Sequence, residues 1–410
     1  MKPFRLLIIA AICFSCSSLA LAVETTALDS ATQKTLDNYL THQGKPEGVT
    51  GIGATIRYPD NNEVITKNFA AGVIGFPPLN TEQVTTDNLF QIGSITKSFV
   101  AALILQLEAE GKLSIDDKIG KWFPEYPNWK DVTIKQLLNM TSGIPSYTKN
   151  ITFLKKVYAN IDLHMTTKEL LTYSSPEKPL KFGKNKFDYS NTNYILAGMI
   201  IEKETELSFE DALQKRILTP FALNNTYYPV NKDAYDKLMP RMVHGYYHDD
   251  EDSKKMIDIT TGDLSWAGAA GAIVANTQDV STWVNVLYHG LFVPEKSRAQ
   301  ILTELESIVS MKTGKPITKV TAADPKGFGL GIGRIYQKGL GQFWLYEGSS
   351  MGYRVRYIWR QCNDVSTVAA LNNKAGEDNS TKDGGSHSQE LVVDLYKNII
   401  ASLPKLNCKD

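Results

Sequence analysis

The sequence is poor in the side chains that build metal centres. Its 410 residues include only four cysteines and six histidines. None of them has the paired spacing of a zinc or iron–sulfur site, so we expect no metal and no other cofactor. Two of the cysteines, Cys362 and Cys408, lie far from the N-terminus, where they could form a disulfide or remain two free thiols.

An excess of charge of either sign is also missing. The chain has 44 lysines and arginines and 44 aspartates and glutamates, so its formal net charge is zero. Proteins that bind nucleic acid or an anionic membrane surface usually carry a basic patch or stripe. The balanced composition therefore gives no reason to expect either of them as a partner.

Long hydrophobic runs are limited to the N-terminus. Lys2 and Arg5 precede an apolar stretch, and Ala20-Leu21-Ala22 has the small residues of a signal-peptide cleavage site. The stretch is too short for a permanent membrane span, and no later run approaches the roughly 18 apolar residues that a span needs. We therefore expect residues 1–22 to be a signal peptide and the mature protein to be periplasmic or secreted, with no stable membrane span.

A lipid anchor at Cys16 is the alternative to ordinary cleavage. Cys13 stands where the usual lipoprotein signal has Leu, Val or Ile, which argues against the anchor. Loss of the signal peptide would remove two basic residues and leave a charge of only about −2.

What the chain does contain is a serine and a lysine at a predicted helix start. Ser94-Ile95-Thr96-Lys97 opens an apolar helical pattern that runs to about Glu110, with Gly111 as a stop signal. Residues three apart share one helix face, so the hydroxyl and the amine can touch. The amine can then accept the serine proton, which makes a nucleophile without histidine. The same spacing recurs at Ser146–Lys149, Ser175–Lys178 and Ser402–Lys405.

A second motif offers a proton donor and a polar positioning group. In Tyr189-Ser190-Asn191, the phenol of Tyr189 can shuttle a proton, and the amide of Asn191 can hold a substrate carbonyl and the lysine. Tyr-x-Asn triplets are common, and others begin at Tyr126, Tyr158 and Tyr396. The motif gains weight only in combination with Ser94 and Lys97.

The order of the predicted elements indicates an α+β architecture. In the first half of the chain, a helix is predicted at 31–43, strands at 51–58 and 63–66, and helices at 94–110 and from 131 to about 143. In the last part, strands are predicted at 327–336, 342–346, 353–360 and 366–372. A mobile loop is predicted at 377–388 and a final helix at 388–403. Strands at both chain ends predict a discontinuous sheet subdomain, residues 23–90 and 262–410, with a mostly helical insertion at 91–261.

These motifs, in this order, resemble the serine β-lactamase and D-alanyl-D-alanine carboxypeptidase family of the class C type. The stretches that carry the resemblance beyond the two motifs are Leu113-Ser114-Ile115-Asp116-Asp117, Trp122-Phe123-Pro124-Glu125, residues 132–145 with Leu137-Leu138-Asn139-Met140-Thr141-Ser142-Gly143, and residues 269–279. The resemblance implies an antiparallel sheet flanked by helices from both chain ends. It also implies a small-molecule or peptide substrate, such as a cell-wall peptide, while the oligomeric state stays open.

The resemblance assigns roles to individual residues. It implies Ser94 as the acylated nucleophile, Lys97 as its base, Tyr189 as the acid/base partner and Asn191 as a substrate-positioning residue. The third family motif, on a strand beside the nucleophile, matches Tyr346-Glu347-Gly348-Ser349. There Gly348 would let the strand approach the substrate, and the backbone N–H groups of Ser349 and Ser94 would bind the oxyanion.

The third motif departs from the family pattern, which reads Lys or His, then Thr, then Gly. Tyr346 offers a hydroxyl but no positive charge for a substrate carboxylate. Glu347 would repel a carboxylate if it faced the cleft, and would be harmless if it faced solvent. Arg354 or Arg356 could supply a replacement cation. Met140 stands where many relatives carry His, and we expect it only to pack.

Several alternative functions remain to be weighed. Gly348-Ser349-Ser350-Met351-Gly352 matches the G-x-S-x-G elbow of α/β-hydrolases, with His387 downstream, but a strand rather than a helix is predicted next. A catalytically inactive cell-wall-binding homologue is disfavoured because Ser94, Lys97, Tyr189 and Asn191 are all present. Among enzymes that share the acyl-serine step, we expect a hydrolase of D-amino-acid-containing peptides, similar to D-alanyl-D-alanine carboxypeptidases and β-lactamases. An esterase for neutral substrates is the alternative.

Overall fold

The structure is a computed structural model that describes residues 27–180, 186–248, 256–372 and 387–408. The predicted signal peptide, residues 1–22, lies outside these residues, and so does the predicted mobile loop at 377–388 up to residue 386.

A nine-stranded antiparallel sheet runs through the molecule in the order β2-β1-β14-β13-β12-β11-β10-β8-β9. Its strands are β1 (Gly51–Asp60), β2 (Glu63–Gly72), β8 (Ile308–Ser310), β9 (Pro316–Ile317), β10 (Lys326–Phe328), β11 (Gly333–Gln337), β12 (Gly341–Ser350), β13 (Tyr353–Arg360) and β14 (Val365–Asn372). The two ends of the chain meet where β1 pairs with β14, for example Ala54 with Ala369. This pairing agrees with the expected sheet of strands from both chain ends, whereas the subdomain boundaries 23–90, 91–261 and 262–410 stay a prediction.

Short turns set the register of two hairpins of the sheet, of which only β12–β13 borders the serine turn. Asn61 and Asn62 join β1 to β2 with φ of 45° and 68°, a conformation that asparagine tolerates better than most residues. Met351 and Gly352 join β12 to β13, and Gly352 has φ of 78°. The loop at Asn61 and Asn62 has two positive φ values, which match the natural twist of paired strands, whereas in the loop at Met351 and Gly352 only the glycine has a positive φ. Each two-residue loop fixes which residues of its hairpin lie opposite one another.

Two predicted elements are wrong in their extent. The strand expected at 327–336 is split into β10 and β11, because the chain turns at 329–332, where Gly331 has φ of 75°. The helix expected from 131 to about 143 is the short α4 (Ile134–Leu138), which Thr133 and Gln136 begin with a capping box. It ends early because Met140 adopts a left-handed conformation with φ of 62°.

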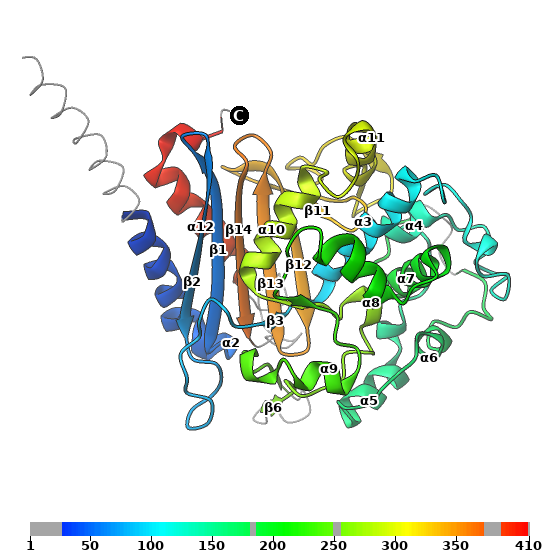
Figure 1. Ribbon diagram of the computed structural model, residues 1–410, viewed down its shortest axis with the longest axis horizontal. Helices are drawn as coiled ribbons and strands as arrows, with labels where there is room; N and C mark the ends of the chain where they lie inside the picture. The colour runs from blue at the N-terminus through cyan, green and yellow to red at the C-terminus, as the bar shows by residue number, and fades with distance from the viewer. Residues whose placement is uncertain (1–26, 181–185, 249–255, 373–386, 409–410) are drawn as a thin grey trace, which may run out of the picture.

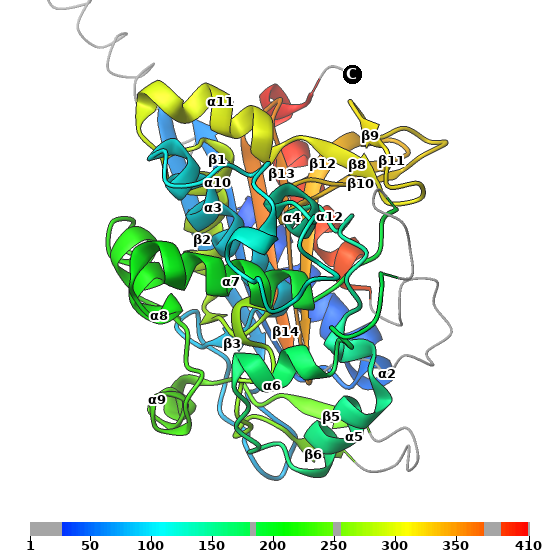
Figure 2. The same ribbon diagram turned by 90° about the vertical axis from the view of Figure 1, so that its right-hand side faces the viewer.

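Helices cover both faces of the sheet (Figures 1 and 2). One face carries the helical residues 27–39, which continue through η1 (Leu40–Gly44) and α2 (Lys45–Glu47), and α12 (Ser388–Ser402) with the short η8 (Pro404–Leu406). The other face carries η2 (Gly93–Ile95), α3 (Thr96–Ala109), η3 (Ile119–Lys121), α4, η4 (Tyr147–Lys149), α5 (Ile151–Ala159), α6 (Thr167–Thr172), α7 (Thr192–Thr205), α8 (Phe209–Leu213), η5 (Gln214–Leu218), α9 (Lys232–Asp236), η6 (Met239–Arg241), η7 (Gly268–Ala270), α10 (Thr277–Tyr288) and α11 (Glu295–Leu305). Short strands there are β3 (Phe90–Gln91), β4 (Thr226–Tyr227), β5 (Tyr246–His248), β6 (Met256–Asp258) and β7 (Val274–Ala275).

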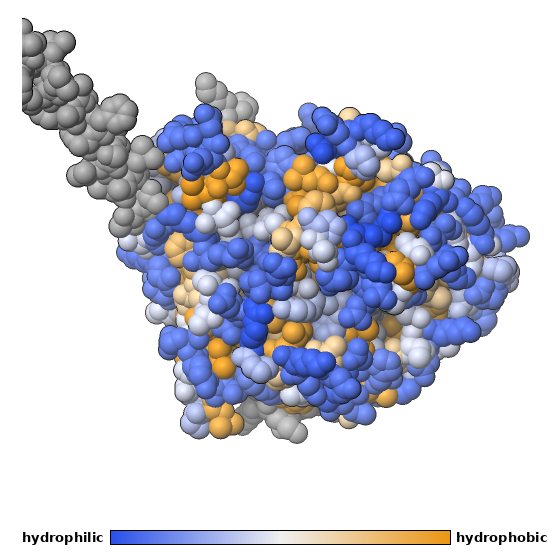
Figure 3. Space-filling model, viewed as in Figure 1, coloured by the Kyte–Doolittle hydropathy of each residue, from blue (hydrophilic) through white to orange (hydrophobic). Residues whose placement is uncertain are grey.

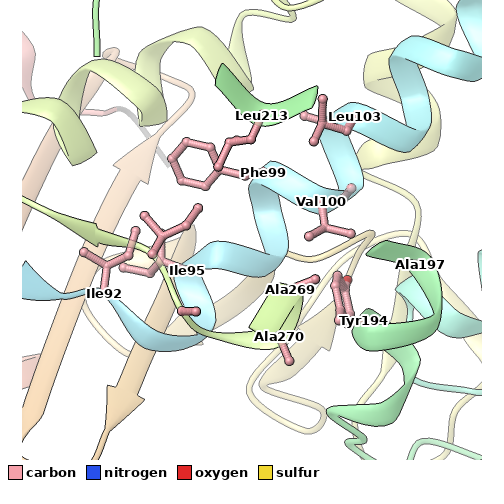
Figure 4. Packing of buried hydrophobic residues seen from close by; sticks show 14 of the residues in the cluster. Ile92, Ile95, Phe99, Val100, Leu103, Tyr194, Ala197, Leu213, Ala269 and Ala270 are labelled. Atoms are coloured by element: carbon pink, nitrogen blue, oxygen red, sulfur yellow. The ribbon is translucent and has the colours of Figure 1, made fainter. Parts of the chain in front are cut away.

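The sheet separates two apolar clusters, one under the helices of the chain ends and a larger one on the other side. Helix α3 lies at the centre of the larger cluster and is buried around most of its circumference (Figure 4). Phe99 from α3 stacks on Trp283 of α10, with ring centroids 4.0 Å apart. A helix held on all sides in this way gives the residues at its start a fixed position.

The surface and the C-terminal tail add three observations. On the face shown in Figure 3, apolar residues form small groups among hydrophilic ones. Within the described part of the chain, none of the helices combines the length and hydropathy that crossing a membrane requires. Cys362 and Cys408 form a disulfide with a Cα–Cα distance of 5.9 Å, so they are not the two free thiols that the sequence also allowed.

Candidate active site

Three residues predicted from the motifs meet at the start of α3. Lys97 Nζ donates a hydrogen bond to Ser94 Oγ at 2.9 Å, and the hydroxyl of Tyr189 donates to the same oxygen at 2.8 Å. Ser94 thus has both an amine and a phenol against its hydroxyl. The structure brings together the three side chains that an amine-assisted serine nucleophile requires.

Lys97 is fully buried and its ammonium has few polar partners. Besides Ser94, Nζ donates to the backbone oxygen of Ala270 at 2.5 Å. The rings of Tyr189 and Tyr194 lie 5.1 and 5.5 Å from Nζ. Burial lowers the pKa of Lys97 below its ordinary value, and the neighbouring Tyr189 opposes the shift only in part. A lowered pKa increases the share of neutral amine, which is the form that can accept a proton.

The turn that presents Ser94 depends on a close approach between η2 and β12. Gly93 has φ of 50°, and a Cβ there would lie 2.7 Å from the backbone oxygen of Ser349. A Cβ on Gly348 would lie only 1.7 Å from the backbone oxygen of Ile92 and 3.1 Å from the nitrogen of Ser94. Both positions therefore need glycine, and the contact places the backbone of β12 directly beside the serine.

The backbone N–H of Ser349 points toward this contact. Ser350 and Tyr353 flank a two-residue turn and are opposite one another in the ladder, so they form its hydrogen-bonded pair. The amide of the preceding residue, Ser349, must then face the other edge of β12, where Ser94 lies. Two backbone N–H groups at this place fit the predicted oxyanion site.

Tyr346 joins the same cluster from β12. Its hydroxyl is 3.3 Å from that of Tyr189, and its ring is buried. Burial raises the pKa of Tyr346 well above 10, and the neighbouring Tyr189 adds to the shift. Tyr346 is therefore a neutral hydroxyl at neutral pH, and no charge replaces the cation of the family motif.

Glu347 points to the opposite face of β12, toward α12. Its two carboxylate oxygens contact Arg354 Nη1 at 3.0 Å and Arg356 Nη2. The side chain is 26% exposed. The sequence analysis left two places open for this carboxylate, the cleft and the solvent. The structure instead shows Glu347 in an ion pair with Arg354 and Arg356. The two arginines are therefore not free to bind a substrate carboxylate.

Asn191 lines the same cleft as Ser94 but makes different contacts from those expected. Its Nδ2 donates to Thr148 Oγ1 at 3.0 Å, and its backbone N–H donates to Ser146 Oγ at 3.0 Å. Its buried Oδ1 has no hydrogen-bond partner among the described residues, so the expected contact with Lys97 is not formed. The amide therefore keeps one unpaired acceptor, which is buried beside the cleft that Asn191 lines.

The remaining walls of the cleft were not predicted as site residues. They are Tyr147, Trp266, Ala267, Ala270, Gly271 and Ser350, and they complete the cleft with Ser94, Asn191 and Ser349, which were predicted. Tyr147 is fixed by a hydrogen bond from its hydroxyl to the backbone oxygen of Trp266 at 2.8 Å. Neither aromatic residue carries a local sequence signal, because a wall of a cleft is defined by residues far apart in the chain.

The rival motifs are not assembled into sites. Ser349 and Ser350 are followed by a turn and β13, not by the helix that a nucleophile elbow needs. His387 instead contacts Glu47 Oε1 at 2.6 Å, at the start of α12 on the face of the sheet that this helix covers. Among the described residues, no group of three histidine, cysteine, aspartate or glutamate side chains is arranged to hold a metal ion. Met140 is buried, with Sδ 3.4 Å from the backbone nitrogen of Ser190.

Comparison with known proteins gives one matching family. The profile of the family described as Beta-lactamase matches residues 37–388. Penicillin-binding protein 4* of Bacillus subtilis (strain 168) is 26% identical over 306 residues, 70% of this chain and 61% of the relative. Protein flp of Staphylococcus aureus (strain N315) is 27% identical over 269 residues, 63% of this chain and 49% of the relative. The matched region thus spans only about half to three-fifths of these relatives.

Solved structures with a similar fold cover more of the chain. The D-amino acid amidase of Ochrobactrum anthropi SV3, in complex with D-phenylalanine, has a TM-score of 0.74 and 25% identity, and covers 92% of this chain and 99% of its own. The D-stereospecific amidohydrolase of Streptomyces sp. has a TM-score of 0.68 and 26% identity, with coverages of 84% and 94%. The expected architecture, a β-lactamase-like α+β fold with an antiparallel sheet flanked by helices, is confirmed.

Proposed function

The chain belongs to the beta-lactamase family of serine hydrolases, and we propose that it is an exported enzyme that hydrolyses D-amino-acid-containing peptides or amides through a Ser94 acyl-enzyme. The observation that carries the proposal is the double contact on Ser94 Oγ, from Lys97 Nζ at 2.9 Å and the Tyr189 hydroxyl at 2.8 Å. Export rests on the sequence of residues 1–22 alone.

The geometry supports a two-step reaction. Neutral Lys97 accepts the hydroxyl proton while Ser94 Oγ attacks the substrate carbonyl carbon, and the N–H groups of Ser94 and Ser349 stabilise the oxyanion. When the carbon–nitrogen bond breaks, Lys97 returns the proton to the leaving amine, directly or through the hydroxyl of Tyr189. A water molecule then attacks the ester carbon and gives a proton to the same groups. The bond between that carbon and Ser94 Oγ breaks, Oγ regains the proton from Lys97 or Tyr189, and the acid is released.

One observation favours D-amino acid derivatives, and a second favours substrates that carry an N–H group. The structural neighbours with about one quarter identity over most of the chain are a D-amino acid amidase and a D-stereospecific amidohydrolase. The unpartnered Oδ1 of Asn191 is buried beside the cleft, and a turn of this side chain toward the substrate would let it accept a hydrogen bond from an N–H group, which a peptide or an amino acid amide provides and a simple ester lacks. The substrate would enter beside Tyr147 and Trp266, which line the cleft.

A neutral ester is the second candidate substrate. Tyr346 is uncharged, and Arg354 and Arg356 are held by Glu347, so the third motif presents no free cation to a carboxylate. An ester substrate needs no such clamp. The same acyl-enzyme chemistry would serve it.

The test compares substrates on the purified mature protein. D-Phenylalanine amide, L-phenylalanine amide, a D-alanyl-D-alanine peptide and 4-nitrophenyl acetate would be assayed with wild type, Ser94→Ala and Ser402→Ala. Ser402 is the matched control because Ser402 and Lys405 have the motif spacing at the C-terminal end of α12. Turnover of a D-substrate that is lost only in Ser94→Ala supports the proposal. Turnover of the ester alone favours the esterase, and turnover that survives Ser94→Ala contradicts both.

A further inference from the structure

Two arginines beside the candidate site are buried against a single carboxylate. Arg354 and Arg356 have side chains only 7% and 5% exposed, and both reach Glu347 from the neighbouring strand β13. Glu347 lies directly opposite Arg356 in the ladder, and Arg354 lies opposite Ser349. All four side chains occupy the face of the sheet that α12 covers.

Glu347 uses its whole carboxylate on this pair. One oxygen takes Arg354 Nη1 and the other takes Arg356 Nη2, while Arg356 Nη1 donates to Gln389 Oε1 of α12 at 3.2 Å. The buried Nε atoms of both arginines have no hydrogen-bond partner within the described residues. Two buried cations without an anion would be strongly unfavourable, so this group requires a carboxylate at the position of Glu347.

The ion-paired group adjoins the part of β12 that faces the substrate. Gly348, the next residue, lies against Ile92 and the nitrogen of Ser94, and Ser349, on the same face as Glu347, lines the cleft. β11 pairs only with residues 341–344 of β12, so in the described structure the edge at 346–350 has no strand on the cleft side. A substrate that extends along this edge passes one or two positions along β12 from Glu347, whose carboxylate lies on the α12 face of the strand and is still 26% exposed.

We propose that Glu347 is a built-in carboxylate that fills the anion position of Arg354 and Arg356, and thereby makes the enzyme select substrates without a carboxylate there. The inference rests on the proposed function and names its substrate class, which is amides and esters rather than peptides with a free C-terminal carboxylate. A substrate carboxylate would meet a position already occupied by a negative charge. Glu347 is then a specificity-determining residue of the third motif.

The experiment uses two substrates that differ in one group. A peptide that ends in D-alanyl-D-alanine and its C-terminal amide would be compared by kcat/KM in wild type and Glu347→Gln. Glu295→Gln, which changes an exposed glutamate of α11, is the matched control. Wild type should have the higher kcat/KM for the amide. Glu347→Gln should raise the ratio of kcat/KM for the carboxylate substrate to kcat/KM for the amide at least tenfold, whereas Glu295→Gln should not change this ratio.

A second variant covers the case in which Glu347→Gln fails to fold because it leaves two buried cations unpaired. Glu347→Gln combined with Arg356→Met keeps one free guanidinium, Arg354, and should also raise the ratio. The further change Arg354→Met in that background should return it to the wild-type value. In parallel, acetate should inhibit amide hydrolysis more strongly in the Glu347 variants than in wild type.

The outcomes separate this inference from the proposed function. Amide turnover through Ser94 with a ratio that does not change in either Glu347 variant overturns the inference and leaves the function intact. A wild-type enzyme that already prefers the free carboxylate also overturns it. Absence of turnover with both substrates in wild type contradicts the proposed function, and the inference with it.

Discussion

The contact between β12 and the serine turn predicts a large effect from one added methyl group, in Gly348→Ala. The Cβ of alanine would lie 1.7 Å from the backbone oxygen of Ile92, whereas real Cβ contacts are essentially never shorter than 3.0 Å. The two segments must therefore separate by about 1.3 Å, the difference between these distances. Because both are backbone in a packed interior, no side chain can move instead.

This displacement acts on the oxyanion site. The N–H groups of Ser94 and Ser349 flank Gly348, so their spacing widens together with the backbones. Loss of one oxyanion donor typically lowers kcat by about 10²–10³, and a misplacement of about 1 Å can cost about 10². We expect Gly348→Ala to lower kcat by about 10²–10³, with a smaller effect on KM and an overpacking cost of roughly 1–3 kcal/mol in the free energy of unfolding.

The assay is steady-state hydrolysis of whichever substrate wild type accepts, with thermal unfolding measured on the same samples. Gly262→Ala is the matched control, because its Cβ would meet its nearest neighbours at 3.2 Å, none of them in β12, so only a slight adjustment is needed. If Gly348→Ala is folded and keeps kcat within threefold of wild type, β12 does not hold an oxyanion donor against Ser94, and the reasoning is refuted.

Three further predictions concern single groups. Lys97→Met should lower kcat by about 10²–10⁴ in steady-state assays. Because burial lowers the folded-state pKa of Lys97 below its ordinary value of 10.5, this lysine costs wild type stability at every pH below 10.5. The variant should therefore gain stability in urea at neutral pH, and the gain should shrink as the pH rises toward 10.5; a gain that does not change with pH would contradict the lowered pKa. Tyr189→Phe should lower kcat by about 10²–10⁴ without a comparable loss of melting temperature, and a change below threefold would remove Tyr189 from the proton transfer. Cys362→Ser with Cys408→Ser should lower the free energy of unfolding in urea by about 2–4 kcal/mol, given the 46-residue separation, while kcat stays as in wild type; an equal loss of activity and stability would mean that the tail supports the site.

Local sequence patterns predicted the elements that carry the chemistry. The spacing of Ser94 and Lys97 at the start of an apolar helix corresponds to η2 and α3, and the alternation after Gly352 corresponds to β13. These features depend on residues close together in the chain, where periodicity and turn chemistry decide the conformation. Tyr189 is predicted only when its Tyr-x-Asn motif is combined with the Ser94–Lys97 motif.

Contacts between distant segments could not be predicted in the same way. The backbone oxygen of Ala270 that accepts from Lys97 lies 173 positions further along the chain, and a carbonyl carries no sequence signal. Strand alternation places Glu347 and Tyr346 on opposite faces, but it does not say that Arg354 and Arg356 both bind Glu347. The early end of α4 at Leu138 also follows from the buried left-handed Met140, which helix propensity does not indicate.

The central claim is that Ser94 carries the acyl group, and the most direct test is peptide-mapping mass spectrometry after a rapid acid quench of the enzyme with D-phenylalanine methyl ester. The account predicts a phenylalanyl adduct on the peptide that contains Ser94, present in wild type and Ser402→Ala and absent in Ser94→Ala. An adduct on another residue, or equal turnover by Ser94→Ala without any adduct, would contradict it. An inactive cell-wall-binding homologue would give neither an adduct nor turnover.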